Sequence, residues 1–136
     1  MHEISVKCLV SSRIPSPFGT YRMHLYKNPR DSLEHLAFVF GDLQSVSLNA
    51  FQVMDTPLKR SLRGADTDAK IPACLTDPVI VRIHSCCFTG ETGASLRCDC
   101  GEQLQESMRA MQIAGKGVIV YLKQEGRGIG LHQKLL

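Results

Sequence analysis

The sequence lacks any long hydrophobic run. Its longest apolar stretches, residues 36–40 and 118–122, have the length of β-strands and fall far short of a membrane span. Residues 1–7 do not begin a basic region followed by an apolar one, so we expect no secretory signal peptide and no membrane partner. Without secretion, the six cysteines are better interpreted as reduced thiols or metal ligands than as disulfides, and we expect a cytoplasmic protein.

The sequence also lacks a strong net charge. The formal charge of +3 at pH 7 suits an anionic small ligand but is too weak and too scattered to indicate DNA or RNA, so we expect no nucleic-acid partner. A hydrophobic content of 43% and a charged content of 21% are ordinary for a globular protein and argue against wholesale disorder. The length of 136 residues predicts a single domain over residues 1–136.

Apolar residues predict three strands in the first third of the chain; they alternate with polar residues in the first two and form a continuous run in the third. The strands cover residues 4–10, 21–26 and 36–40, and the two prolines and the glycine within residues 14–19 predict a turn between the first two strands. Residues 42–78 show no such pattern. A connection this long within a compact domain predicts an insertion or loop.

The clearest helix signal lies at residues 101–114. Apolar residues recur there at helical intervals and predict a stripe that faces the core. The stripe consists of Leu104, Met108 and Met111. Asp99 stands three residues before Glu102, which is the spacing of a capping box, and Gly115 fits the position just after a helix end.

Strands flank this helix on both sides. Residues 79–83 predict a buried strand before it, and residues 117–122 predict a strand of buried, parallel-sheet character after it. Strand, helix and strand in sequence make a crossover unit, right-handed by default. The pattern predicts an α/β fold with a mixed sheet and flanking helices, of the three-layer α/β/α type. A helix has barely begun where the sequence stops at Leu136, so we expect a fold truncated at its C-terminal side.

Four of the six cysteines lie between residues 86 and 100. Cys98 and Cys100 are separated by one residue and Cys87 lies eleven positions earlier, so three thiolates can close on one metal ion. Three thiolates on zinc leave a fourth tetrahedral position open, as in a catalytic site. The alternatives are a structural zinc with a fourth ligand and a group of three free thiols. Candidates for the fourth ligand are His84, Cys86 and Cys74.

Residues 124–130 form a glycine-rich loop between a strand and a helix start. Three glycines stand within five residues, with Glu125 and Arg127 beside them. Such a loop can direct N–H groups and an arginine fork at phosphates, although plain turns have the same composition. Together with a metal site, the loop suggests hydrolysis of a nucleotide-like substrate.

These motifs closely resemble GTP cyclohydrolase II of riboflavin biosynthesis. The resemblance is strong from residue 79 to the end and looser over residues 4–41, where Ile14-Pro and Val39-Phe-Gly-Asp match. Its strongest segments are Arg-Ile-His-Ser at 82–85, Thr89-Gly, Ser-Leu-Arg-Cys-Asp-Cys-Gly-Glu-Gln at 95–103 and Gln-Glu-Gly-Arg-Gly-Ile-Gly-Leu at 124–131. The long segment 42–78 is similar to an extension in the fungal type of the enzyme.

The resemblance implies a zinc-dependent hydrolysis that opens the imidazole ring of GTP and releases formate and pyrophosphate. It also implies Mg²⁺ with the triphosphate and a homodimer when the protein has its full length. By motif, the zinc ligands would be Cys87, Cys98 and Cys100. The GTP-binding residues would be Arg82, Ile83, His84, Ser85, Gln103, Glu125, Gly126 and Arg127.

The sequence departs from the family pattern in two places. Cys86 stands where the family usually has glutamate, which removes a carboxylate from the nucleotide site. The family's catalytic acid and its proposed nucleophilic arginine would lie beyond Leu136. Alternative hypotheses are therefore a catalytically inactive relative that retains zinc and nucleotide binding, and a structural zinc module that binds a protein partner.

Overall fold

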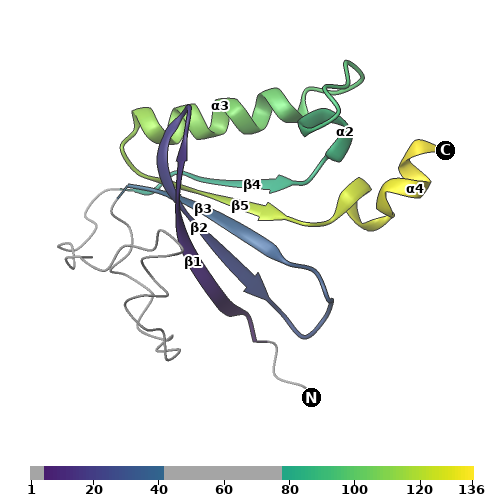
Figure 1. Ribbon diagram of the computed structural model, residues 1–136, viewed down its shortest axis with the longest axis horizontal. Coiled ribbons are helices and arrows are strands. Elements are labelled where there is room, and N and C mark those ends of the chain that lie inside the picture. The colour runs from purple at the N-terminus through teal and green to yellow at the C-terminus, as the bar shows by residue number, and fades with distance from the viewer. Residues whose placement is uncertain (1–4, 42–77) are drawn as a thin grey trace.

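The computed structural model describes residues 5–41 and 78–136, which form one mixed β-sheet with helices (Figure 1). The strands are β1 (Lys7–Ser16), β2 (Gly19–Lys27), β3 (His35–Phe40), β4 (Val81–Ser85) and β5 (Gly117–Leu122). Their spatial order is β1-β2-β3-β5-β4. The pairs are antiparallel except β4 with β5, which is parallel. The predicted α/β class with a mixed sheet is confirmed.

The first hairpin is tighter than the sequence pattern predicted. β1 continues through Pro15, and Ser16 already pairs with Gly19, so the turn is confined to two residues and the turn predicted over residues 14–19 was wrong at its ends. Pro15 is tolerated because β1 is an edge strand, where a missing N–H group leaves no ladder partner unpaired. The Ser16 hydroxyl donates to the Gly19 carbonyl at 2.6 Å, and Gly19 has a φ of 98° that favours glycine.

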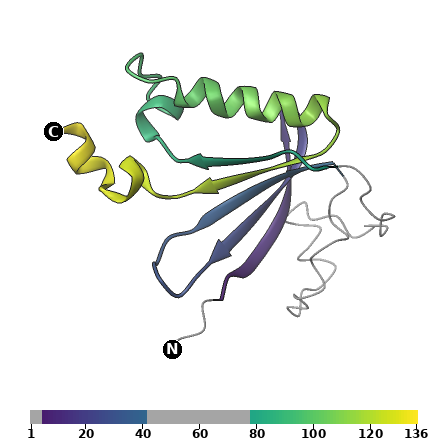
Figure 2. The ribbon, with the colours of Figure 1, turned by 180° about the vertical axis from the view of Figure 1, so that it is seen from behind.

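Helix α3 (Cys100–Ile113) lies along one face of the sheet, as the two opposite views in Figures 1 and 2 show. The core between them is centred on Phe40, Met111 and Ile119, which are almost completely buried. This confirms the predicted helix and its apolar stripe. A Cβ atom on Gly117 would lie 1.8 Å from Met111 Sδ, so glycine at the start of β5 lets helix and strand approach closely.

The ends of α3 agree with the prediction at one end only. Gly115 has a φ of 72° and follows the C-cap residue, as predicted. Asp99 occupies the N-cap position, but its side chain makes no capping hydrogen bond. The Asp99 carboxylate instead accepts a hydrogen bond from the Gln103 side-chain amide at 2.8 Å. The predicted capping box was therefore wrong.

Strand β4 lies at the edge of the sheet and is not the buried strand that its apolar composition predicted. Arg82 reaches toward α3, so Val81 and Ile83 face the opposite side, where they are 60% and 69% exposed. The described residues supply one helical layer, α3, and the second layer of the three-layer arrangement stays a prediction. The predicted insertion at 42–78 lies outside the described residues except for its last position.

No helix within residues 5–41 and 78–136 combines the length and the apolar character needed to cross a membrane.

Candidate metal centre

Three cysteine sulfur atoms converge where β4, a short helix and α3 meet. Cys87 follows β4 and precedes α2 (Phe88–Glu91), and Cys100 is the first residue of α3. The Sγ atoms of Cys87, Cys98 and Cys100 all lie within 4.8 Å of one another, and those of Cys87 and Cys98 are 3.7 Å apart. Zn–S bonds of about 2.3 Å in tetrahedral geometry place two sulfurs about 3.8 Å apart. The donor set and its spacing therefore fit a zinc ion.

A glycine makes room for this convergence. A Cβ atom on Gly90, inside α2, would lie 2.7 Å from Cys98 Sγ and 3.3 Å from Cys87 Sγ. A Cβ atom on Gly101 would lie 2.5 Å from the Gly90 carbonyl oxygen, so α2 and α3 also touch backbone to backbone. The sequence pattern did not predict α2, and it therefore did not indicate why Gly90 is needed.

The candidates for a fourth protein ligand do not join the three sulfurs in the part of the chain that the structure describes. His84 is buried, and its Nε2 lies 2.9 Å from Glu91 Oε1. Cys86 Sγ faces Glu125 Oε2 at 3.9 Å. Cys74 lies outside the described residues. Among described side chains, the three cysteine sulfurs thus form the group that could hold a metal ion.

The Glu91 carboxylate fixes the backbone beside the first of these ligands. Its Oε1 accepts from the Cys87 N–H at 2.8 Å and faces His84, while its Oε2 accepts from the Tyr121 hydroxyl at 2.6 Å. His84 and Tyr121 also stack, with ring centroids 5.5 Å apart. Burial, followed by the Glu91 carboxylate, raises the pKa of Tyr121. Sequence reasoning missed Glu91 and Tyr121, because only the undetected helix α2 brings Glu91 back to Cys87.

A lysine from the end of the chain also contacts the cysteine group. Lys134, in α4 (Gly130–Leu135), donates from Nζ to Cys87 Sγ at 3.0 Å and to Glu125 Oε1 at 2.5 Å. The hydrogen bond from this ammonium lowers the pKa of the Cys87 thiol to about 6. Burial, with hydrogen bonds to the other two cysteines, raises the pKa of Cys100 to about 12. The group therefore carries one readily formed thiolate before metal binding.

Glu125 is held from two sides. Its Oε2 accepts from the Phe88 N–H at 2.8 Å, and its Oε1 accepts from Lys134. Burial opposes ionisation of this carboxyl, but the hydrogen bonds from Lys134 and Phe88 outweigh it and lower the pKa of Glu125. Sequence reasoning expected Glu125 to contact GTP and did not indicate Lys134.

Four of the remaining predicted nucleotide-binding residues, Arg82, Ile83, Ser85 and Gln103, lie on β4 and α3 and have different surroundings. The Arg82 Nη2 donates to Gln103 Oε1 at 2.8 Å, which joins these two predicted residues across β4 and α3. The Ser85 hydroxyl lies 3.4 Å from the carbonyl oxygen of Gln124. The Ile83 side chain is exposed on the sheet face away from α3. None of these four residues lines either of the two cavities described below.

The glycine-rich loop after β5 turns sharply. It forms the short 3₁₀ segment η1 (Glu125–Gly128), in which Gly126 and Arg127 have φ values of 60° and 59°. A φ in this range is uncommon for arginine. That side chain is exposed to solvent. The predicted loop after β5 is thus present, and the Arg127 guanidinium is accessible.

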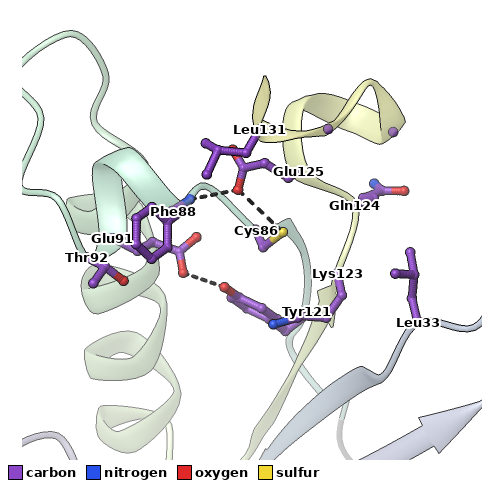
Figure 3. A pocket seen from close by; sticks show the side chains of 12 residues that line it. Leu33, Cys86, Phe88, Glu91, Thr92, Tyr121, Lys123, Gln124, Glu125 and Leu131 are labelled. Carbon is purple, nitrogen blue, oxygen red and sulfur yellow. Dashed lines mark hydrogen bonds between the residues drawn. The ribbon is translucent and has the colours of Figure 1, made fainter. Parts of the chain in front are cut away.

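Two cavities adjoin the turn that carries Cys87, and Phe88 lines both. The larger, of about 520 Å³, lies between β5, η1 and α2 (Figure 3). Figure 3 shows the Tyr121–Glu91 contact and the Glu125 contacts with Phe88 and Cys86 around it. The smaller, of about 420 Å³, opens onto Cys98. Two cationic side chains, Arg97 and Lys134, line this smaller cavity.

Comparisons with known proteins agree on one family. The family described as GTP cyclohydrolase II matches residues 7–136. The chain is 42% identical to GTP cyclohydrolase-2 of Meyerozyma guilliermondii, covering 96% of this chain and 48% of the relative. It is 38% identical to GTP cyclohydrolase-2 of Saccharomyces cerevisiae, with 96% and 50% covered. It is 42% identical to the riboflavin biosynthesis protein RibBA of Chlorobium phaeovibrioides, with 96% and 24% covered. The chain thus spans about half the length of the curated GTP cyclohydrolase-2 relatives it matches, and a smaller share of RibBA.

Proposed function

This chain belongs to the GTP cyclohydrolase II family, and we propose that it provides the zinc-binding part and one side of the nucleotide site of an enzyme that opens the imidazole ring of GTP. The reaction is a hydrolysis that releases formate from the ring and pyrophosphate from the triphosphate. It stands at the start of riboflavin biosynthesis. The relatives named for GTP cyclohydrolase and riboflavin biosynthesis support this assignment.

The convergence of three cysteine sulfurs carries the proposal. Cys87, Cys98 and Cys100 would hold the ion, with the spacing that tetrahedral Zn–S bonds require. A zinc ion with three protein ligands supplies Lewis acidity at an open coordination position. The cavity that opens onto Cys98 would give a ligand access to an ion held there. The cationic residues Arg97 and Lys134 at the same cavity favour an anionic substrate.

The nucleotide would be bound by residues on both sides of the turn that carries Cys87. Arg127 has an exposed guanidinium that suits a triphosphate by charge and geometry. Arg82 and Gln103, already hydrogen-bonded to each other, would contact the nucleotide at the edge of the sheet. Mg²⁺ would accompany the triphosphate. Cytoplasmic location and homodimer formation by the full-length protein complete the proposal.

Zinc content, GTP binding and formate release test the proposal in one preparation. We expect one zinc per chain and saturable GTP binding, measured by metal analysis and calorimetry. Cys98→Ser should lose the zinc, whereas Cys8→Ser, outside the cysteine group, should retain it. Arg127→Ala should weaken GTP binding, whereas Arg13→Ala, which makes the same charge change on the edge strand β1 at the other side of the sheet, should not. A chain that binds neither zinc nor GTP would refute the proposal.

The half-length match favours a second function, in which the chain binds zinc and nucleotide without turnover. Formate release from GTP separates the two, measured with the zinc-loaded chain and with the Cys98→Ser variant as the blank. Zinc-dependent formate release assigns the enzymatic function to this chain. Zinc and GTP binding with no formate assigns the binding function. Zinc without GTP binding would indicate instead a structural zinc module.

A further inference from the structure

Lys134 approaches the turn that carries Cys87 from a distant part of the sequence. Its Nζ donates to Cys87 Sγ across 47 sequence positions, at 3.0 Å. Cys87 itself is buried, with 5% of its surface exposed. Neither the motif pattern nor the comparisons assign a role to this lysine. A buried sulfur that already has an ammonium donor is held in one direction before any metal arrives.

Glu125 closes a ring of interactions around the same turn. One carboxylate oxygen accepts from Lys134 at 2.5 Å, and the other accepts from the Phe88 N–H at 2.8 Å. Phe88 is the residue directly after Cys87. The ring therefore runs from Cys87 through Phe88, Glu125 and Lys134 and back to Cys87. It fixes both the backbone and the sulfur of this one cysteine.

The loop between the two charged residues is shaped to bring them together. Glycines with positive φ at positions 126, 128 and 130 reverse the chain between β5 and α4. A Cβ atom on Gly126 would lie 2.6 Å from the Ile129 side chain and 3.6 Å from Lys134 Cβ. A larger residue there would clash with the Ile129 side chain, next to the start of α4. The glycines thus serve this contact as well as the phosphate binding that their pattern suggested.

The pair is also partly withdrawn from water. The Lys134 and Glu125 side chains are 26% and 16% exposed, so their attraction is screened less than that of a surface pair. Three thiolates and a divalent ion carry a net charge of −1, which an ammonium beside one sulfur offsets. A hydrogen bond to a metal-bound thiolate reduces the electron density that the sulfur donates to the metal.

We propose that Lys134 and Glu125 form a positioning pair that holds the Cys87 sulfur in its metal-binding orientation and tunes its donation to the metal. The inference rests on the zinc site of the proposed function. The competing interpretation is that the pair only anchors α4 to the rest of the domain. Anchoring would change stability but not the electronic properties of a bound metal.

Cobalt(II) is the probe that separates these interpretations, because its thiolate charge-transfer band reports sulfur donation. The variants are Lys134→Met, Lys134→Arg and Glu125→Gln, with Lys27→Met as a control for the loss of one exposed positive charge. Zinc affinity is measured in parallel by competition with a chelator. Circular dichroism verifies that each variant is folded.

We expect Lys134→Met to shift the cobalt band and to weaken zinc binding about tenfold, within the range known for groups that support a metal ligand. Lys134→Arg should restore most of the affinity, because it keeps a cationic donor. Glu125→Gln should weaken binding less, and combining it with Lys134→Met should add little. Lys27→Met should change neither property.

Three results would overturn the proposal. An unshifted cobalt band and unchanged affinity in Lys134→Met, with only a lower melting temperature, would show that the pair merely anchors α4. Tighter zinc binding in that variant would show that the ammonium stands in the place of the metal. If Lys134→Met does not fold, an unshifted band and unchanged zinc affinity in Glu125→Gln decide against the proposal. A wild-type chain that binds no zinc would instead refute the proposed function itself.

Discussion

Replacing Gly90 by alanine tests whether the three sulfurs converge as the structure places them. Gly90 lies inside α2, and its φ is outside the left-handed range, so alanine is compatible with the backbone. In a helix interior, alanine is favoured over glycine by about 1 kcal/mol. The only obstacle is the space between the sulfurs. The added methyl group would lie 2.7 Å from Cys98 Sγ, 3.2 Å from Cys100 Cβ and 3.3 Å from Cys87 Sγ.

The size of the effect follows from these distances. Ordinary contact begins at 3.4 Å, so Cys98 Sγ must move by at least 3.4 − 2.7 = 0.7 Å. Metal–ligand distances tolerate only about 0.2 Å, so this movement removes one ligand from the ideal set. Four-ligand zinc sites bind with about 10–16 kcal/mol, or about 3 kcal/mol per ligand if it is divided evenly. Zinc affinity should therefore fall by about 100-fold.

The assay is competition for zinc with a chelator, combined with urea unfolding of the metal-free chain. Gly115→Ala is the matched control: it has open space around its Cβ but a φ of 72°, so alanine there is strained. It should lower the free energy of unfolding by about 1 kcal/mol and leave zinc affinity unchanged. Gly90→Ala should instead lower zinc affinity without a comparable loss of the free energy of unfolding. Unchanged zinc affinity in Gly90→Ala would refute the geometry of the cysteine group.

Three further predictions concern the rest of the domain. Burial, followed by the charge of Arg22, lowers the pKa of His24 below 6.5, so the stability that neutral His24 contributes is complete above about pH 6.5 and is lost as the pH falls. Between pH 7.5 and 5.5, His24→Gln should therefore lose less free energy of unfolding than the wild type does, and equal losses would contradict this. Tyr121→Phe removes a donor to Glu91 and should cost about 1.5–3 kcal/mol in urea unfolding, whereas a change below about 0.5 kcal/mol would show that water replaces the hydroxyl. Ile119→Ala should cost about 2–5 kcal/mol, because Ile119 is fully buried between α3 and the sheet, and a loss below about 1 kcal/mol would place it outside the core.

The elements with strong periodicity were predictable from the sequence. Residues 101–114 alternate apolar and polar positions at helical spacing, and the observed helix, α3, differs from the prediction by one residue at each end. The strands predicted over 21–26 and 36–40 agree with β2 and β3 to within two residues at each end. Periodicity succeeds there because one face of each element is buried against a continuous core. Local pattern and tertiary packing then favour the same structure.

Position within the sheet was not predictable. An apolar run such as residues 79–83 indicates a strand but does not say which neighbours it has. β4 pairs only with β5 in the described sheet, which leaves Val81 and Ile83 exposed although their composition favours burial. The turn before β2 was misjudged for a similar reason, because Pro15 is compatible with an edge strand and not with a central one. Both errors concern strand order, which is a property of the whole chain.

The candidate site was predictable where the spacing of residue types carries the chemistry. Cys87, Cys98 and Cys100 come together, among the described residues, as a group that could hold a metal ion. The groups that hold them were missed, because Glu91 acts through a four-residue helix too short to show a period. Lys134 acts across 47 positions, a distance at which sequence spacing carries no information about contact.

The two charged residues of the glycine-rich loop after β5 have different surroundings. The family resemblance implied that Glu125 and Arg127 both contact a nucleotide. In the structure, the Glu125 carboxylate is already engaged by Lys134 and by the Phe88 N–H, whereas Arg127 is exposed. A carboxylate at this place would repel a triphosphate unless a cation neutralised it, and Lys134 does so. The loop therefore directs one charged residue toward the turn that carries Cys87 and leaves the other exposed, where it could contact an anionic ligand.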